Sequence, residues 1–415
     1  MSSKIKSIRA REILDSRGNP TVEVELETND GFFIDSVPSG ASTGKYEAKE
    51  IRDEGKRYNG KGVLSAVRNV NEVIGPKIIG ENVLDQEKID KIMIELDGSP
   101  NKSNLGANAI LPISMAVCRA GAKSQKLLLY NYISKISGGK ASVSLPWPCF
   151  NIINGGAHAG NELDIQEFMI IPQENSFSEN LQIGTEIYHS LKNILKKHLG
   201  SYTTNIGDEG GFAPPISMTV QALSLIDKAI KNYPDVKIGL DCAATQFLKE
   251  TRYFLDGTIF IKEGLLDFYQ DLIKNYPIIF LEDPFAEEDF YCFQELTQEF
   301  GDKIIIVGDD LLTTNIGRIK KAKQENACNG IIIKPNQIGT ITETLSAIKL
   351  AKSYNWKIIV SHRSGDTCDD FIADLAVGVS ADFIKSGAPV RGERLSKYNR
   401  LLKIEQEITH HNQFR

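Results

Sequence analysis

The fold is decided by six segments: KIGLD (237–241), IIFLED (278–283), KIIIVGDD (303–310), GIIIKPN (330–336), KIIVSHRS (357–364) and ADFIKSG (381–387). Each contains a short apolar run rich in Ile, Val and Leu, which suits a strand that is buried on both faces. Each is separated from the next by enough chain for a loop and a helix. This alternation predicts an α/β barrel with mainly parallel strands.

All six apolar runs end in side chains that can take part in chemistry. Because the strands of a parallel barrel end at a common mouth, we expect these side chains to converge there. They are Asp241, Glu282, Asp309, Lys334, His362, Arg363, Ser364 and Lys385. Loops are polar by default, so a single strand end of this kind could simply emerge into solvent. Six in succession favour a shared site.

The composition is that of an ordinary globular protein. The 415 residues are 41% hydrophobic and 25% charged, and the formal net charge is −6. This balance argues against nonspecific binding to nucleic acid or to an anionic membrane. The six cysteines contain no Cys-x-x-Cys pair, so we expect reduced thiols rather than disulfides or a zinc site. No apolar run resembles a signal peptide or is long enough to span a bilayer, which predicts a cytoplasmic protein.

The chain is expected to divide into two domains at the Gly- and Ser-rich segment 137–144. Residues 5–37 alternate apolar with acidic side chains, which predicts a small antiparallel sheet. Residues 62–136 carry apolar side chains at helical spacing. We therefore predict an α+β domain over residues 1–136 and a barrel domain over residues 137–415.

The barrel is expected to begin irregularly. Strand-like runs at 145–154 and 164–172 are joined by too few residues for a helical crossover, so they should be antiparallel neighbours. Helical patterns follow at about 177–199 and 217–232. The predicted order is ββαα(βα)6, in which the six segments quoted above supply the regular units.

Three of the strand ends are carboxylates: Asp241, Glu282 and Asp309. Without a cation they would repel one another, and at least one pKa would be raised. An all-oxygen ligand set suits Mg²⁺ better than zinc or copper. The alternative is that these acids form structural salt bridges with Lys334 or Lys385.

The two lysines offer base chemistry. A lysine close to a metal ion and to another cation has a lowered pKa and can act as a general base. Lys334 could instead form a Schiff base, although the acids nearby make this less attractive. Arg363 and Ser364 present donors suited to a phosphate, although a His-Arg-Ser sequence also occurs in ordinary loops.

Acid chemistry is predicted near Glu209. It follows Asp208 in IGDEGGFAP, and a carboxyl beside another carboxylate tends to keep its proton, so Glu209 is a candidate general acid. Glu167 could hold a leaving hydroxyl, and His158 lies on a glycine-rich loop that could close over a substrate. The segment SGASTGK (39–45) fails as a P-loop because its glycines are one residue too close. A lid whose hydroxyls reach a metal or a phosphate stays open as an interpretation.

A series of ordered motifs resembles the enolase family over nearly the whole chain, from about residue 5 to 405. The motifs are SRGNPTVEVE, VPSGASTG, NGGAHAG, QEFMI, GDEGGFAP, LDCA, LEDPFAEED, GDDL, IKPNQIGT, SHRSGDT and IKSGAP. Mandelate racemase and muconate cycloisomerase relatives share a metal triad but lack the GDEGG loop and the SGASTG lid. The resemblance implies reversible dehydration of 2-phosphoglycerate to phosphoenolpyruvate in glycolysis and gluconeogenesis.

The same resemblance implies a role for each matching residue. Asp241, Glu282 and Asp309 resemble the ligands of one Mg²⁺, and Ser42 resembles a ligand of a second Mg²⁺. Lys334 resembles the base and Glu209 the acid, with Glu167 and His158 assisting. The substrate-binding residues implied are His158, Glu167, His362, Arg363, Ser364 and Lys385, with Arg363 and Ser364 on the phosphate and Lys385 on the carboxylate.

The resemblance also implies a homodimer or a higher homo-oligomer in the cytoplasm, with a secondary surface or secreted pool as in some members. No nucleic acid and no membrane is required for the implied reaction. Two alternatives stay open at this point: a binding scaffold of the same fold, and a related enzyme acting on another carboxylate. The scaffold is disfavoured because every implied ligand and the base are present, and the other enzyme because Arg363 and Ser364 suit a phosphate.

Overall fold

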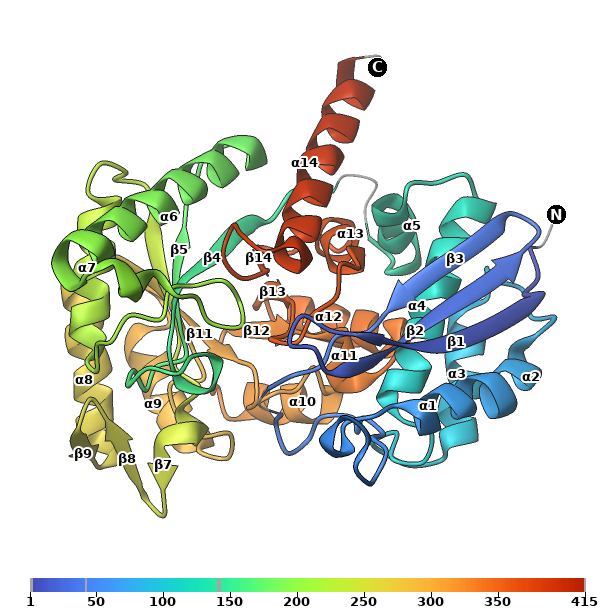
Figure 1. Ribbon diagram of the computed structural model, residues 1–415, viewed down its shortest axis with the longest axis horizontal. Helices are drawn as coiled ribbons and strands as arrows, with labels where there is room; N and C mark the ends of the chain where they lie inside the picture. The colour runs from blue at the N-terminus through green and yellow to red at the C-terminus, as the bar shows by residue number, and fades with distance from the viewer. Residues whose placement is uncertain (1–2, 42, 140–142, 414–415) are drawn as a thin grey trace.

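A computed structural model of the chain describes residues 3–41, 43–139 and 143–413 (Figure 1). The strands are β1 Ser7–Leu14, β2 Pro20–Thr28, β3 Gly31–Ser36, β4 Trp147–Asn154, β5 Glu167–Ile171, β6 Lys237–Asp241, β7 Leu248–Lys249, β8 Arg252–Leu255, β9 Thr258–Phe260, β10 Ile278–Glu282, β11 Ile305–Gly308, β12 Gly330–Ile333, β13 Lys357–Ser361 and β14 Phe383–Lys385. The α-helices are α1 Leu64–Arg68, α2 Gly75–Ile78, α3 Gln86–Asp97, α4 Ala107–Ser124, α5 Leu129–Ile136, α6 Phe177–Leu199, α7 Thr219–Ile230, α8 Lys262–Asn275, α9 Phe290–Phe300, α10 Ile316–Gln324, α11 Pro335–Ile338, α12 Ile341–Ser353, α13 Phe371–Gly378 and α14 Gly392–Gln413.

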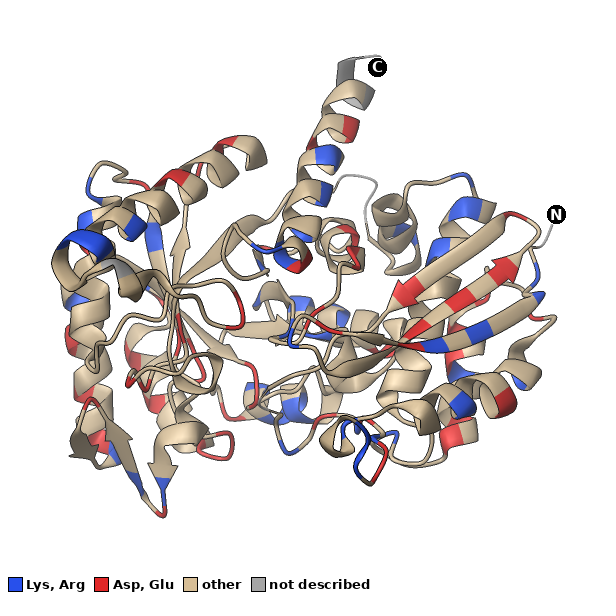
Figure 2. Ribbon diagram, in the orientation of Figure 1, with Lys and Arg blue, Asp and Glu red and all other residues tan. Residues whose placement is uncertain are grey.

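The N-terminal sheet is antiparallel in the order β1-β2-β3, as predicted. Its register sets basic residues of β1 opposite acidic residues of β2, with Arg9 facing Glu25 and Arg11 facing Glu23. Figure 2 shows these blue and red segments side by side. Opposite charges in directly facing positions stabilise an antiparallel pair, so the charge pattern supports this register.

Helices α1 to α5 accompany this sheet, and α4 packs against β2 and β3 (Figure 1). Almost all of α4 is buried, which explains its nearly continuous run of small and apolar residues. The packing of α4 on the sheet buries the apolar face of the sheet, including Val22, Val24 and Leu26. The predicted α+β arrangement of this part of the chain is confirmed.

Eight strands close into a barrel in the order β10-β11-β12-β13-β14-β4-β5-β6. Every neighbouring pair is parallel except β4 with β5 and β5 with β6, which are antiparallel. The chain order is β4, β5, α6, α7 and then six strand–helix units from β6 to α14. The predicted ββαα(βα)6 barrel is therefore confirmed, including the antiparallel start.

One element of the barrel domain was not predicted. Between β6 and α8 the chain forms a small antiparallel sheet of β7, β8 and β9, which Figure 1 shows at the outer edge of the barrel. These strands have two to four residues, which is too short for an alternating pattern to stand out. The local sequence signal was the Asp256–Gly257 pair, which favours a tight hairpin turn. Both residues have positive φ, as such a turn requires.

The interior of the barrel is filled by side chains from seven of its strands. They form a cluster of their own, separate from the rest of the core: Cys149, Met169, Ile171, Phe280, Val307, Ile332, Ile359 and Phe383. The remaining strand, β6, contributes Gly239 at this level, where a Cβ would lie 2.3 Å from the Phe280 ring. The missing side chain makes room for that ring, so the barrel is packed and not a pore.

Several barrel helices start at residues that the sequence marks as N-caps. The side chains of Ser176, Asn315 and Thr340 accept hydrogen bonds from backbone N–H groups in the first turn of α6, α10 and α12. These bonds satisfy donors that have no partner within the helix. Local sequence therefore fixes where these helices begin.

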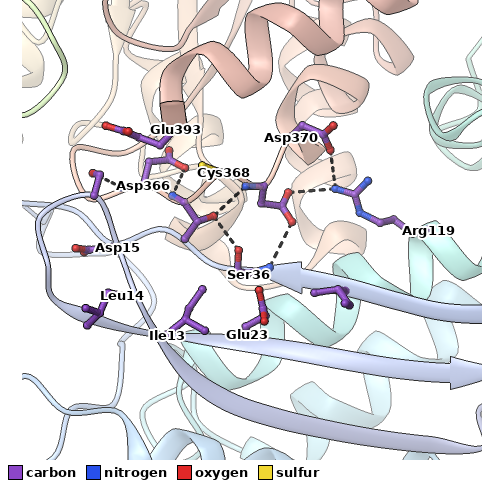
Figure 3. Close-up of a pocket in the computed structure, with 14 residues that line it drawn as sticks. Ile13, Leu14, Asp15, Glu23, Ser36, Arg119, Asp366, Cys368, Asp370 and Glu393 are labelled. Carbon is purple, nitrogen blue, oxygen red and sulfur yellow. Dashed lines mark hydrogen bonds and ion pairs between the residues drawn. The ribbon is translucent and has the colours of Figure 1, made fainter. Parts of the chain in front are cut away.

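An ionic cluster joins the N-terminal sheet to the barrel (Figure 3). Arg119 of α4 donates to Asp35 of β3 at 2.7 Å, and to Asp369 at 3.1 Å and Asp370 at 3.0 Å in the loop after β13. A cavity of about 640 Å³ lies beside this cluster, lined on one side by β1 to β3 and on the other by residues 366–370 and Glu393. It contains none of the predicted site residues, so size alone does not identify the site.

All six cysteines are free, and five of them are buried, as expected for reduced thiols that fill core space. Within the described ranges, none of the helices combines the length and the apolar character needed to cross a membrane.

Candidate active site

The barrel register brings predicted residues to one level of the mouth. Asp241 ends β6 and pairs across the sheet with Glu282, which ends β10. Glu167 also pairs with Asp241, because β5 runs antiparallel and therefore begins at the mouth. Lys385 is the last residue of β14, another strand of the same barrel. The prediction that these side chains converge is confirmed.

Lys385 lies among three carboxylates and is 2% exposed. Its Nζ lies 2.6 Å from Glu282 Oε2, 3.1 Å from Glu167 Oε2 and 3.4 Å from Asp241 Oδ2. Burial lowers the pKa of Lys385, but the three negative charges outweigh it and hold the pKa well above its usual value. Lys385 is therefore a fixed positive charge at the floor of the mouth.

Lys334 follows β12 and pairs with Asp309, which follows β11. Gln337 donates to the other oxygen of Asp309 at 2.9 Å. Burial lowers the pKa of Lys334, but the Asp309 charge raises it by more, and the net pKa lies above its usual value. The expectation that a metal ion and a second cation lower this pKa stays a prediction for the metal-bound site.

The carboxylates at the ends of β10 and β11 form what we call the acidic cluster: Glu282, Asp283, Asp309 and Asp310. Oxygen atoms of Asp283, Asp309 and Asp310 lie within 4.8 Å of one another. Burial and the charge of Asp309 raise the pKa of Asp310 to about 8, and burial with the charge of Asp241 raises the pKa of Glu282 well above its usual range. Glu282 Oε1 is buried without a hydrogen-bond partner. A hard divalent cation would remove all of these penalties, so the residues fit Mg²⁺.

The predicted triad of Asp241, Glu282 and Asp309 is not one of the groups whose oxygens all lie within 4.8 Å of one another. Lys385 pairs with Asp241 and Glu282, while Lys334 pairs with Asp309. The two ammonium groups supply the positive charge, and they hold the three carboxylates in separate ion pairs. The salt bridges that the sequence raised as an alternative are therefore present, and the metal triad stays a prediction.

A second set of groups, which we call the imidazole cluster, consists of His158, Glu167 and Glu209. His158 Nδ1 lies 3.5 Å from Glu167 Oε1 and 3.4 Å from Glu209 Oε1. Asn151 donates to Glu209 Oε2 at 2.9 Å. All three residues of the cluster are buried, so their charges interact with one another more strongly than they would in bulk water.

The reason given above for a proton on Glu209 is wrong. Burial raises the pKa of Glu209, but the nearby charges, first His158 and then Arg394, outweigh burial and hold it well below its usual range. Burial and the Glu209 charge raise the pKa of Glu167 to about 8 instead. The charge of Glu209 also raises the pKa of His158, although burial lowers it. The electrostatics of the cluster therefore favour a proton on Glu167 or His158 over one on Glu209.

The predicted phosphate-binding residues contact Ala41, Glu47 and Asn336. Arg363 donates to Glu47 at 2.9 and 3.2 Å and to Asn336 at 3.1 Å. Ser364 Oγ accepts from the backbone N–H of Ala41 at 2.7 Å. The predicted ligand Ser42 lies outside the described residues.

One cavity contains residues from both clusters. Its lining includes His158, Glu167, Glu209, Asp241, Asp309, Asp310, Lys334, His362, Arg363 and Ser364. Lys385 lies next to this cavity through its ion pair with Asp241, and Glu282 pairs in turn with Lys385. The structure thus brings together every predicted site residue that it describes.

Sequence reasoning missed three buried residues that contact the site: Glu47, Gln337 and Arg394. Glu47 pairs with Arg363, and Gln337 holds Asp309. Their signal was proximity to recognised motifs, because Glu47 follows the lid segment and Gln337 lies three residues after Lys334. Arg394 lies within α14 and had no such signal.

Comparison with known proteins identifies both parts of the chain. The family model described as "Enolase, N-terminal domain" matches residues 5–133, and the one described as "Enolase, C-terminal TIM barrel domain" matches residues 142–415. The chain is 53% identical to "Enolase" from Methanothrix thermoacetophila, covering 98% of this chain and 97% of that protein. It is also 53% identical to "Enolase B" from Dictyostelium discoideum, covering 97% of this chain and 95% of that protein.

Matches at this identity over nearly full length, with a barrel mouth that holds the expected acids and lysines, leave one conclusion. The chain belongs to the enolase family and is a hydro-lyase of the phosphopyruvate hydratase type.

Proposed function

We propose that this barrel mouth dehydrates 2-phosphoglycerate to phosphoenolpyruvate, with Lys334 as the base and Glu209 as the acid. The observation that carries these assignments is the single cavity that both residues line. A base and an acid held in one water-poor cavity can act on neighbouring carbons of a three-carbon substrate.

The metal assignment rests on Glu282 and Asp309 of the acidic cluster and on Asp241, which pairs with Glu282 across the sheet. We assign one Mg²⁺ to Asp241, Glu282 and Asp309 and a second to Ser42 with the substrate. Mg²⁺, when bound, neutralises these carboxylates and stabilises the negative charge that develops on the substrate carboxylate. If Asp309 served as a ligand, its charge would hold the proton of Lys334 less strongly, and the neutral amine of Lys334 would be the base.

The acid assignment rests on the imidazole cluster. The pKa of Glu209 is lowered and those of Glu167 and His158 are raised, so a proton for Glu209 is supplied by one of these two neighbours. His158 Nδ1 contacts both carboxylates, so it can pass a proton to Glu209. Glu209 then donates that proton to the departing C3 hydroxyl, which leaves as water.

Substrate binding is assigned to the cationic groups. Lys385 is proposed to contact the substrate carboxylate, and Arg363 with Ser364 to contact the phosphate. The forked guanidinium of Arg363 already holds the two oxygens of Glu47, which is the geometry that a phosphate would take. His158, Glu167 and His362 complete the lining around the hydroxyl groups.

Three coarser features complete the proposal. We place the domain division at residues 136/137, supported by two family models that meet near this position. We propose a homodimer or a larger homo-oligomer, and a cytoplasmic location with a possible surface or secreted pool. Gel filtration with light scattering tests the oligomeric state, and cell fractionation tests the location.

The direct test of function is turnover of 2-phosphoglycerate, followed by the ultraviolet absorbance of phosphoenolpyruvate. We expect turnover with Mg²⁺, loss with excess EDTA and recovery when Mg²⁺ is restored. Absence of turnover in folded, Mg²⁺-loaded protein would contradict the proposal.

A further inference from the structure

Arg394 contacts residues 362–364 and Asp208 from outside the site cavity. It lies in the first turn of α14, is 0% exposed, and is not among the residues that line the site cavity. Its Nη1 lies 2.6 Å from His362 Nδ1 and donates to the Arg363 carbonyl at 2.6 Å. Its Nη2 donates to the Ser364 carbonyl at 2.6 Å and to the Asp208 carbonyl at 3.0 Å. One guanidinium thus holds three consecutive residues together with the loop that carries Glu209.

The contact with His362 fixes the position of the imidazole proton. A guanidinium has only donors and no acceptor, so His362 Nδ1 must be the acceptor and carries no hydrogen. The single ring proton of the neutral imidazole is then on Nε2. That atom lies 3.5 Å from Glu209 Oε1. His362 therefore directs an N–H group at the carboxylate assigned as the acid.

The charged groups around His362 support a neutral ring. Burial lowers its pKa, and the charges of Arg394 and Lys385 lower it further, while Glu209 and Asp366 act in the opposite direction. The net result is a pKa well below its ordinary value. A second proton would have to enter on Nδ1, where Arg394 already donates.

We propose that Arg394 is a positioning residue that locks His362 as the neutral Nε2–H tautomer and aligns it with Glu209. The proposal rests on the acid role assigned to Glu209 above, although the tautomer itself does not depend on that role. In this arrangement His362 presents its Nε2–H to Glu209 Oε1 across 3.5 Å and takes up no second proton. The same guanidinium keeps the Arg363–Ser364 segment in register with the Asp208–Glu209 loop.

The tautomer can be observed without any assay of activity. The chain has six histidines, so ¹⁵N-labelled imidazole spectra are tractable, and loss of one signal in His362→Gln identifies His362. We expect the protonated-nitrogen shift at Nε2 and the bare-nitrogen shift at Nδ1, with no titration over the pH range in which the protein is folded. A titrating ring, or a hydrogen on Nδ1, would overturn the proposal.

The positioning role is tested with Arg394→Lys and a matched control on the same helix. Arg400→Lys is that control, because Arg400 holds Asp374 at 2.7 Å through two bonds and contacts no residue of the site. Both variants replace a forked donor by a single ammonium, so both should lower the melting temperature. Only Arg394→Lys should also lower kcat, by about 100-fold, because the acid is no longer aligned.

The two results separate a positioning role from a structural one. In Arg394→Lys we expect the His362 signals to move toward a mixture of tautomers or to titrate, with a larger loss in kcat than in the affinity for Mg²⁺. A variant with wild-type kcat and an unchanged His362 spectrum would overturn the proposal, whatever its melting temperature. If wild-type protein showed the locked tautomer but no turnover of 2-phosphoglycerate, the proposed function would fail while the tautomer assignment stood. If Arg394→Lys did not fold, the wild-type spectrum would still decide the tautomer.

Discussion

The acidic cluster and the imidazole cluster both contain carboxylate side chains, but they use them for different chemistry. Both contain buried carboxylates at the mouth of one barrel. In the acidic cluster, carboxylates face other carboxylates and two lysines, so a divalent cation relieves the repulsion. In the imidazole cluster, His158 lies between two carboxylates, so protons can move among them. The partners of a carboxylate, and not its burial, decide whether it binds a metal or handles a proton.

The largest expected effect comes from the lysine that faces the acidic cluster. Lys334→Ala should lower turnover by about 10³-fold, because it removes the proposed base and no other lysine lines the cavity among the described residues. Steady-state kinetics measure the loss. Lys102→Ala is the control, since Lys102 is an even more deeply buried lysine that pairs with Glu343 at 2.5 Å outside the site. Near-normal activity in Lys334→Ala would rule out its role as the base.

Next in size is the removal of one charge from the acidic cluster. Asp309→Asn should weaken Mg²⁺ binding by about 100-fold, because ligand charge sets the affinity for a hard cation. Calorimetric titration with Mg²⁺ measures the change. Asp256→Asn provides a control at a half-buried carboxylate outside the mouth, bonded to Thr219, and should bind Mg²⁺ as the wild type does. Equal affinities in the two variants would contradict the metal assignment.

The pH dependence of Mg²⁺ binding should follow the acidic cluster. The pKa of Asp310 is raised to about 8, so below that pH Asp310 holds a proton, and Mg²⁺ on the neighbouring Asp309 should drive its release. The affinity should therefore rise with pH, by about tenfold per unit below pH 8 for one displaced proton. Titrations in buffers of different ionisation enthalpy count the protons released. Binding that is independent of pH from 6 to about 8 would show that the cluster is already ionised.

The smallest effect is on stability. Because Mg²⁺ binds the folded chain, a concentration 100 times its dissociation constant should stabilise the protein by about 2.7 kcal/mol. Thermal or denaturant unfolding with Mg²⁺ and with EDTA measures the difference. Glu209→Gln should show the same gain, because it alters only the imidazole cluster. A gain that disappears in Glu209→Gln would link the two clusters and weaken the distinction between them.

The sequence predicted the barrel and the members of its mouth, because both follow from local patterns. Apolar runs that end in Asp241, Glu282 or Lys385 could be read directly from the chain, and the barrel topology then brings them together. The short strands β7 to β9 were missed because two to four residues carry no clear period.

The charge states could not be predicted in the same way. They depend on contacts between distant segments, such as Lys334 with Asp309 and Arg394 with His362. The proton expected on Glu209 was assigned from its neighbour in sequence, Asp208, whereas its neighbours in space are two imidazoles and an arginine. Sequence proximity was therefore a poor guide to electrostatics in this site.

The central claim is that proton removal and hydroxyl loss belong to different groups of one cavity. It is tested most directly by exchange of the C2 hydrogen of 2-phosphoglycerate with solvent deuterium, followed by NMR in Mg²⁺-loaded wild type, Glu209→Gln and Lys334→Ala. We expect Glu209→Gln to exchange the C2 hydrogen while forming almost no phosphoenolpyruvate, and Lys334→Ala to do neither. Loss of exchange in folded, Mg²⁺-loaded Glu209→Gln, or exchange that persists in Lys334→Ala, would contradict the account.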